Sequence, residues 1–193
     1  AAVRSRRRID EPFSRTASEN AIGKMNQSNL SKINVRMGEI ASRDDGGPIY
    51  TLLGSCIGLA LYARRQRIGG LAHIVLPESR EPVSHPGKFA DTAIPLLIEQ
   101  MRKTAGTPLQ LVAQLAGGAS MFSTSVSTNI GEQNAEACRA ILKSNRVPIL
   151  AEHVGGGAGR RMTFDTSDGS VMIEIVGQKP FKLSHASSGV SKG

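Results

Sequence analysis

The chain has 193 residues, of which 39% are hydrophobic, and this is enough for one domain with a substantial core. Aromatic residues make up 4% and Trp is absent, so the core must be aliphatic and rich in alanine. The formal net charge is +8, but +5 of it lies in residues 1–36, so the charge says little about the domain and does not indicate a nucleic-acid-binding surface.

The cysteine content and the hydropathy pattern exclude several further classes. Cys56 and Cys138 are too few for a disulfide framework, and the sequence has no C-x-x-C pair typical of metal or redox sites. No apolar run approaches the roughly 20 residues of a membrane-spanning helix, and the N-terminus lacks the apolar stretch of a secretory signal. We therefore expect a cytoplasmic protein with no membrane insertion, metal or other cofactor.

The first 32 residues are predicted to be an extension outside the domain. They are rich in Arg, Ser and Asn and show no sustained apolar period, which favours disorder. A nucleic-acid-binding arm would place aromatic residues among the basic ones, and Phe13 is alone. We divide the chain into a basic extension over 1–32, a domain over 33–178 and a polar C-terminal tail over 179–193.

The first half of the domain is predicted to be rich in β-strands. Alternating apolar and polar residues favour a first strand over 33–38, and the Gly, Asp and Pro content of 42–48 favours a loop. Further strands are expected over 49–53, 56–63 and 68–76.

The second half is predicted to combine two helices with more strands. Apolar residues three and four apart from Ala90 to Met101 indicate a helix, although Pro95 lies within it. If Asp91 or Thr92 caps this helix, Pro95 falls in the first turn, where its missing N–H matters least. The remaining expectations are strands over 109–115 and 148–152, a helix after Asn129 with Glu132 in a capping-box position, Cys138 on that helix's apolar stripe, and a hairpin of 162–164 with 171–175.

The candidate catalytic residues are a cysteine and a histidine on neighbouring predicted strands. Cys56 directly follows Gly54 and Ser55, and Gly54 permits a tight turn at a strand end. His73 lies on the next strand, so the two side chains can meet and a base can generate the thiolate nucleophile. We expect Cys56 to be partly exposed beside this base. The alternative is a core cysteine, because free cysteine in an apolar run is commonly buried.

Five motifs in one order resemble the chemoreceptor glutamine deamidase (CheD) family, over about residues 35–176. They are Leu53–Gly54–Ser55–Cys56; Gly70–Leu71–Ala72–His73 with Leu76–Pro77; Gly117–Gly118–Ala119–Ser120–Met121–Phe122; Asn129–Ile130–Gly131 with Asn134; and Gly155–Gly156 with Arg160. The expected fold is α/β, with mixed β-sheets packed as a sandwich and two main helices outside.

The resemblance implies hydrolysis of glutamine side-chain amides in chemotaxis receptors. It assigns the nucleophile to Cys56, the base to His73 and the orienting third position to a threonine ahead of the cysteine, here Thr51, with Tyr50 as the alternative. The backbone N–H groups of the Gly54–Ser55–Cys56 turn are natural donors to an oxyanion. His153 is a reserve second base, and 155–160 is a structural turn because no Walker or dinucleotide pattern is present.

Substrate and partner selection are predicted from the loop over 77–87 and from the family. The loop contains three prolines and follows the His73 strand, so Glu78, Ser79 and Arg80 are candidates for contacting the substrate. The resemblance implies a CheC-type phosphatase as a further partner, and we expect a monomer. Two alternative functions stay open: another Cys–His thiol hydrolase, such as an amidase or protease, and a regulatory binding module.

Overall fold

The structure, a computed structural model, describes residues 30–79, 84–120 and 130–184. The compact unit begins at Ser31. Its first sheet has the order β1-β3-β8-β9-β10, with β1 at Ile33–Asn34, β3 at Pro48–Leu53, β8 at Arg160–Asp165, β9 at Ser170–Ile175 and β10 at Phe181–Lys182. The second has the order β2-β5-β4-β6-β7, with β2 at Ile40–Arg43, β5 at Ile68–Ile74, β4 at Ile57–Ala63, β6 at Leu111–Gly117 and β7 at Ile149–Val154.

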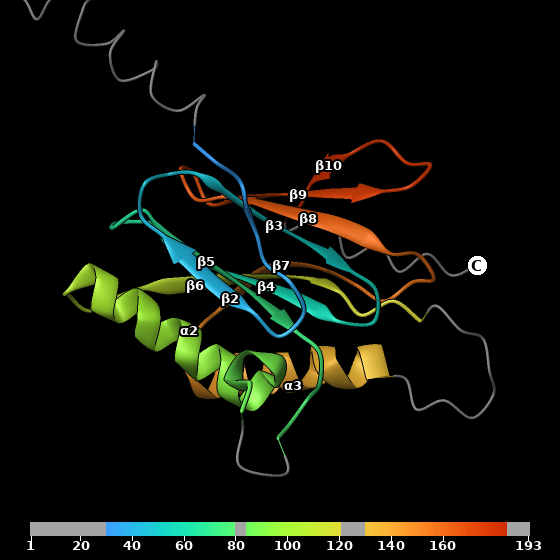
Figure 1. The fold of residues 1–193 in the computed structure, drawn as a ribbon, viewed down its shortest axis with the longest axis horizontal. Helices are drawn as coiled ribbons and strands as arrows, with labels where there is room; N and C mark the ends of the chain where they lie inside the picture. Colours follow the sequence, from blue (N-terminus) through green and yellow to red (C-terminus); the bar gives the residue numbers. More distant parts are fainter. Residues whose placement is uncertain (1–29, 80–83, 121–129, 185–193) are drawn as a thin grey trace, which may run out of the picture. The chain divides into compact units, whose positions relative to one another are not determined.

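Two helices cover the second sheet on the side away from the first sheet (Figure 1). They are α2, Ala90–Ala105, and α3, Ile130–Ser144; the short 3-10 helix η2, Pro86–Lys88, precedes α2. Both sheets are mixed, because β1 runs parallel to β3 and β6 parallel to β7 while the other pairs are antiparallel. The predicted α/β sandwich of mixed sheets with two outer helices is confirmed.

The second sheet separates two apolar cores. One core lies between this sheet and the helices and contains Leu97, Met101, Cys138 and Leu142. The other lies between the sheets and contains Leu53, Phe164 and Ile173. Strands β4 and β5 are buried at every residue, because they are covered on both faces. This explains their continuous apolar sequences.

Two boundaries in the first half differ from the prediction. The strand predicted over 33–38 is only Ile33–Asn34, and the region predicted as a loop from residue 42 begins inside β2.

Helix α2 starts at Ala90 with Phe89 as its N-cap and no side-chain cap, so Pro95 lies inside the helix. Neither Asp91 nor Thr92 is the N-cap, because both lie inside the helix. The Asp91 carboxylate accepts the N–H and hydroxyl of Ser79, and the Thr92 hydroxyl donates to the Pro86 carbonyl.

The chain stays packed beyond residue 179, where the C-terminal tail was predicted to begin. Phe181 and Lys182 form β10 against β9, and Leu183 is buried with its N–H donated to the Val171 carbonyl. A strand of two residues is too short to show a period, so the sequence pattern does not reveal it. The tail from residue 185 lies outside the described residues, as do residues 1–29 of the extension.

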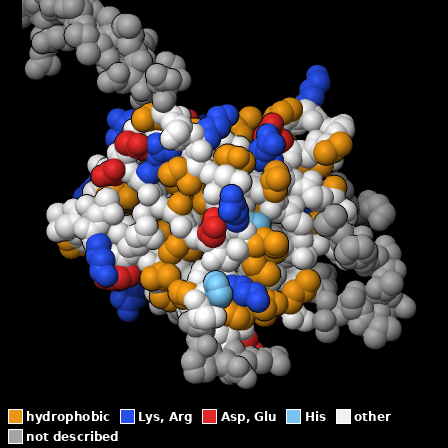
Figure 2. Space-filling view, in the orientation of Figure 1, with side chains coloured by type: hydrophobic (Ala, Val, Ile, Leu, Met, Phe, Trp, Pro, Cys, Tyr) orange, Lys and Arg blue, Asp and Glu red, His pale blue; other side chains and the backbone are white. Residues whose placement is uncertain are grey.

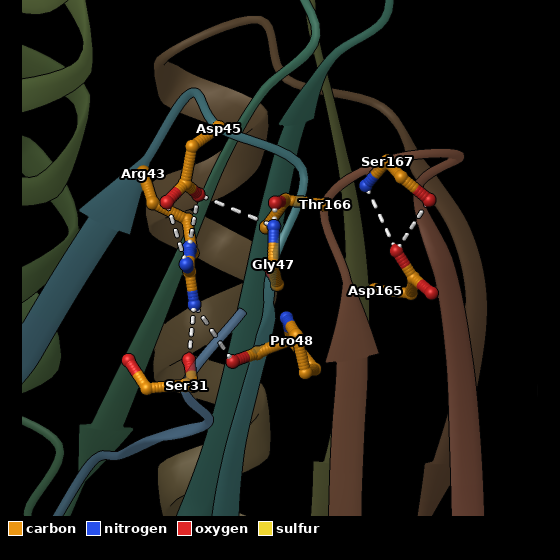
Figure 3. Close-up of polar contacts among 8 residues, drawn as sticks. All are labelled: Ser31, Arg43, Asp45, Gly47, Pro48, Asp165, Thr166 and Ser167. Carbon is orange, nitrogen blue, oxygen red and sulfur yellow. Dashed lines mark hydrogen bonds and ion pairs between the residues drawn. The ribbon is translucent and has the colours of Figure 1, made fainter. Parts of the chain in front are cut away.

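A cluster around Arg43 ties the start of the compact unit to the β2–β3 loop (Figure 3). Arg43 pairs with Asp45 and donates to the carbonyls of Ser31 at 2.9 Å and Pro48 at 3.2 Å. The guanidinium packs against Gly47, where an added Cβ would lie 2.1 Å from its central carbon, so a larger residue would displace the Arg43 side chain. Elsewhere on the surface, acidic, basic and hydrophobic side chains are interspersed on the face shown in Figure 2.

Candidate active site

The turn that carries Cys56 connects β3 of the first sheet to β4 of the second. Strand β4 pairs antiparallel with β5, and Gly58 lies opposite His73. Cys56 precedes Gly58 by two residues, so continuation of the strand places its side chain on the same face as His73. That face is turned toward the first sheet, because Cys56 packs in the core between the sheets and Thr51 of β3 contacts the His73 ring.

The hydroxyl of Thr51 lies between the His73 imidazole and a backbone carbonyl. It donates to the Val35 carbonyl at 2.6 Å and lies 2.7 Å from His73 Nδ1. Because a hydroxyl has a single proton, the second contact requires His73 Nδ1–H as the donor. The neutral ring therefore carries its proton on Nδ1 and keeps the lone pair of Nε2. Among the described residues this buried Nε2 has no hydrogen-bond partner, so it is available to accept a proton.

Thr51, and not Tyr50, contacts the imidazole. Successive side chains of β3 point to opposite faces, and Thr51 is fully buried whereas Tyr50 is half-buried. The Tyr50 ring lies under the guanidinium of Arg161, whose Cζ is 5.8 Å from the ring centroid. The strand register thus places Thr51, and not Tyr50, against the imidazole.

Glycine opposite His73 lets the two sheets approach closely at this point. A Cβ on Gly58 would lie 2.8 Å from both Leu53 Cδ1 and Met162 Sδ, which belong to the first sheet. Contacts this short do not occur between real side chains, so a larger residue at this position would require Leu53 or Met162 to move. The Thr51–His73 hydrogen bond spans the same gap and depends on the same close packing.

Burial shifts the pKa values of the two candidate catalytic groups in opposite directions. Burial lowers the pKa of His73 below 6.5, although the Val35 carbonyl and Glu39 act the other way. Burial raises the pKa of Cys56 above 9.0. Cys56 is only 8% exposed, so the expectation of a partly exposed cysteine is wrong, because the turn packs into the core between the sheets. Near pH 7 the resting pair is therefore a thiol and a neutral imidazole.

Alkylation should report this protonation state. We expect iodoacetamide to label Cys56 before Cys138, which is fully buried and whose pKa burial raises to about 12. Because the Cys56 thiolate forms only at alkaline pH, the labelling rate should keep rising through pH 9. Timed labelling followed by mass spectrometry of both cysteine peptides measures each rate. A plateau between about pH 6 and 8 would instead reveal a preformed thiolate–imidazolium pair.

Two glycines allow the chain after β6 to hold the Cys56 turn. Ala119 N–H donates to the Gly54 carbonyl at 2.8 Å, and Gly118 N–H donates to the Cys56 carbonyl at 2.9 Å. A Cβ on Gly117 would lie 2.1 Å from the Cys56 carbonyl oxygen. The Gly54 carbonyl and the Ser55 N–H belong to one trans peptide and point in opposite directions. Because this carbonyl is held toward Ala119, the Ser55 N–H is directed away from Ala119. The motif's Met121 and Phe122 lie outside the described residues.

The second glycine cluster is a turn held by Arg160. The buried Arg160 side chain donates from Nη1 to Nδ1 and the carbonyl of His153, and from Nη2 to the carbonyls of Gly155 and Ala158. His153 Nδ1 is thereby occupied as an acceptor, and burial and the Arg160 charge lower the pKa of this histidine. His153 therefore serves the turn, and no hydrogen bond links it to Cys56 in the described part of the chain.

The predicted substrate loop is only partly described. Glu78 is exposed, Ser79 is bonded to Asp91, and Arg80 lies outside the described residues. A cavity of about 650 Å³ borders the Cys56 turn at Gly54. Its lining includes Leu52, Gly54, Arg161, Val176 and Pro180. Neither Glu78 nor Ser79 lines that cavity. The structure thus joins His73 to Thr51 by a hydrogen bond and places Cys56 in the core on the same face of the second sheet.

One contributor to the site was missed by sequence reasoning. Val35 supplies the carbonyl that orders the Thr51 hydroxyl, and its own N–H donates to the Tyr50 carbonyl. A backbone carbonyl leaves no residue-type signal in a sequence, so no motif could have revealed this role. Over the ranges that the structure describes, no group of three His, Cys, Asp or Glu side chains could hold a metal ion. No helix in these ranges is long and apolar enough to cross a membrane.

Comparison with known proteins identifies relatives over most of the compact unit. The family model described as CheD chemotactic sensory transduction matches residues 75–175. This matched range begins after Thr51, Cys56 and His73. A protein of Clostridium botulinum Alaska E43 is 44% identical over 76% of this chain and 94% of its own. One from Clostridium acetobutylicum is 41% identical over 78% of this chain and 95% of its own. Both are named probable chemoreceptor glutamine deamidase CheD.

A solved structure from Neisseria meningitidis, of family DUF152, is 12% identical, with a TM-score of 0.40 over 75% of this chain and 70% of its own. The family membership rests instead on the family-model match and on the sequence relatives, which this chain matches over 94% and 95% of their own length. The chain belongs to the CheD family of chemotactic sensory transduction proteins.

Proposed function

We propose that the chain is a chemoreceptor glutamine deamidase that converts receptor glutamine side chains to glutamate. The observation that carries the proposal is the hydrogen bond from the His73 imidazole to Thr51, which leaves Nε2 free on the face shared with Cys56. The names of the relatives supply the substrate class. The reaction needs a nucleophile, a proton carrier and oxyanion donors, and the residues of this site can fill each role.

The chemistry begins with proton transfer to an uncharged imidazole. His73 Nε2 takes the Cys56 thiol proton as the sulfur attacks the amide carbon of the glutamine side chain, and the carbonyl oxygen becomes an oxyanion. The backbone N–H groups of Ser55 and Cys56 stabilise this charge. His73 then delivers its proton to the amide nitrogen, and the C–N bond breaks to release ammonia and leave a thioester on Cys56.

Water completes the cycle. His73 removes a proton from the water that attacks the thioester carbon and returns it to the sulfur as the C–S bond breaks, which regenerates the thiol and leaves a carboxylic acid that ionises to glutamate. Thr51 holds the ring in the tautomer that this sequence requires, because its hydroxyl donates to Val35 and accepts from Nδ1. A hydroxyl carries no negative charge, so the imidazole stays a weaker base than one paired with a carboxylate.

The experiment is incubation of the full chain with a cytoplasmic receptor fragment, followed by mass spectrometry of its peptides. We expect single glutamines to gain the mass difference between an amide and a carboxylate, with stoichiometric ammonia. Cleaved peptide bonds, or modification of only free glutamine, would favour another thiol hydrolase. An unmodified fragment that is nevertheless bound would favour a regulatory module.

The setting of the enzyme follows from the same proposal. Receptor glutamines of this kind belong to cytoplasmic segments, so the protein would work in the cytoplasm. We propose that it acts as a monomer and that a CheC-type phosphatase is a further partner. Glu78, Ser79 and Arg80 remain the proposed substrate-contacting residues, in a loop that begins directly after the His73 strand.

A further inference from the structure

A fully buried asparagine on α3 contacts the turn that carries Cys56 and the segment that follows the His73 strand. Asn134 Nδ2 donates to the Ser55 carbonyl at 3.2 Å and to the Val75 carbonyl at 2.9 Å. Both neighbours are carbonyl oxygens, which only accept hydrogen bonds, so the amino group must face them. The orientation of the amide is therefore set by its surroundings.

The two carbonyls lie where the strand pairing ends. The last pair of the β4–β5 ladder is Ile57 with Ile74, and Ser55 and Val75 lie just beyond it. Ser55 directly precedes Cys56, and Val75 follows His73 by two residues. Beyond the ladder, Asn134 links the nucleophile turn to the end of the histidine strand, and α3 supplies this link from the face opposite Thr51.

The bond to Ser55 also sets the direction of a candidate oxyanion donor. The Ser55 carbonyl and the Cys56 N–H belong to one peptide plane and point in opposite directions. Holding the carbonyl toward Asn134 therefore directs the Cys56 N–H away from α3. The Gly54 carbonyl is held in the same way by Ala119 N–H. Two successive peptide planes of the turn are thus fixed before any substrate binds, as preorganised oxyanion stabilisation requires.

We propose that Asn134 is a positioning residue that orients the Cys56 N–H for oxyanion stabilisation, a role that rests on the proposed function. Packing alone does not account for an asparagine here. The Asn134 Oδ1 is buried and has no hydrogen-bond partner among the described residues, which disfavours an amide over an apolar side chain of the same size. The two donated bonds are what an apolar residue cannot supply.

The test compares Asn134→Leu and Asn134→Asp with the unaltered full chain. The probe is p-nitrophenyl acetate, whose reaction with Cys56 passes through an oxyanion but needs no receptor. We expect the rate of Cys56 acylation, and kcat for receptor deamidation, to fall about 10²-fold with KM unchanged. Alkylation of Cys56 by iodoacetamide should change far less, because displacement of iodide develops no oxyanion.

Two internal controls separate positioning from loss of structure. Cys138 lies four residues after Asn134 on the same buried stripe of α3, so its labelling reports undocking of the helix. Leu142→Ala weakens the same helix without touching the turn and should retain acylation. The inference is overturned if the Asn134 variants are acylated at the unaltered rate, or if alkylation and acylation of Cys56 fall equally in them. It is also overturned if Cys138 becomes reactive in these variants or if Leu142→Ala shows the same loss of acylation. Failure of the unaltered chain to be acylated would overturn it as well. Absence of receptor deamidation alone contradicts the proposed function and leaves the acylation result to decide on Asn134.

Discussion

Replacement of Cys56 by alanine is expected to abolish receptor deamidation. Cys56 is the thiol on the face shared with His73, and the Thr51 hydroxyl on that face is already bonded to the Val35 carbonyl and to His73 Nδ1. Removing the nucleophile of a hydrolytic triad lowers kcat by roughly 10⁶-fold, which is below detection in a mass-spectrometric assay. The measurement is the fraction of receptor glutamines converted at long incubation times.

Two matched variants make this result specific. Cys138→Ala removes the other cysteine, which is fully buried between α3 and the second sheet, and should leave deamidation unchanged. Cys56→Ser keeps a side chain of similar shape, but a hydroxyl is a much weaker acid and nucleophile than a thiol, and His73 is supported by a hydroxyl and not by a carboxylate, so the activity should also fall strongly. Activity that survives in Cys56→Ala, or disappears in Cys138→Ala, would mean that the nucleophile has been assigned to the wrong residue.

Replacement of His73 by alanine is expected to lower kcat by about 10²–10⁴-fold, the contribution of a general acid–base group. The loss should be similar for a receptor fragment and a small glutamine peptide, because His73 acts on the reacting atoms. In the unaltered chain kcat should fall on acidification with a midpoint below pH 6.5, since burial disfavours the imidazolium. This acidic limb should be absent from the pH profile of His73→Ala.

Thr51 provides the graded control for His73. Thr51→Val leaves the Val35 carbonyl and the His73 Nδ1–H without their buried partner, so it should reduce kcat and destabilise the fold by about 1–3 kcal/mol. Thr51→Ser retains the hydroxyl and should recover most of both losses. If Thr51→Val has full activity with the same acidic limb, the hydroxyl does not orient the base.

The amino-acid sequence determined the elements whose signals are local. Strands β4 and β5 were predicted because continuous apolar residues between turns indicate strands buried on both faces. Helix α3 followed from the spacing of its apolar residues, and Cys138 is buried on it as predicted. The positions of Cys56 and His73 followed from a glycine turn and from motifs in a constant order, which pointed to the family that the comparisons then identified.

Only the tertiary structure decided how these residues are arranged. The choice of Thr51 over Tyr50, the burial of Cys56 and the close approach at Gly58 all depend on how two sheets pack, and the residues involved are distant in sequence. The contributions of Val35, Ser55 and Val75 are made by backbone carbonyls, which every residue type possesses. A hydrogen bond to such a group depends on where the chain passes and leaves no trace in residue identity, so it becomes visible only in the folded protein.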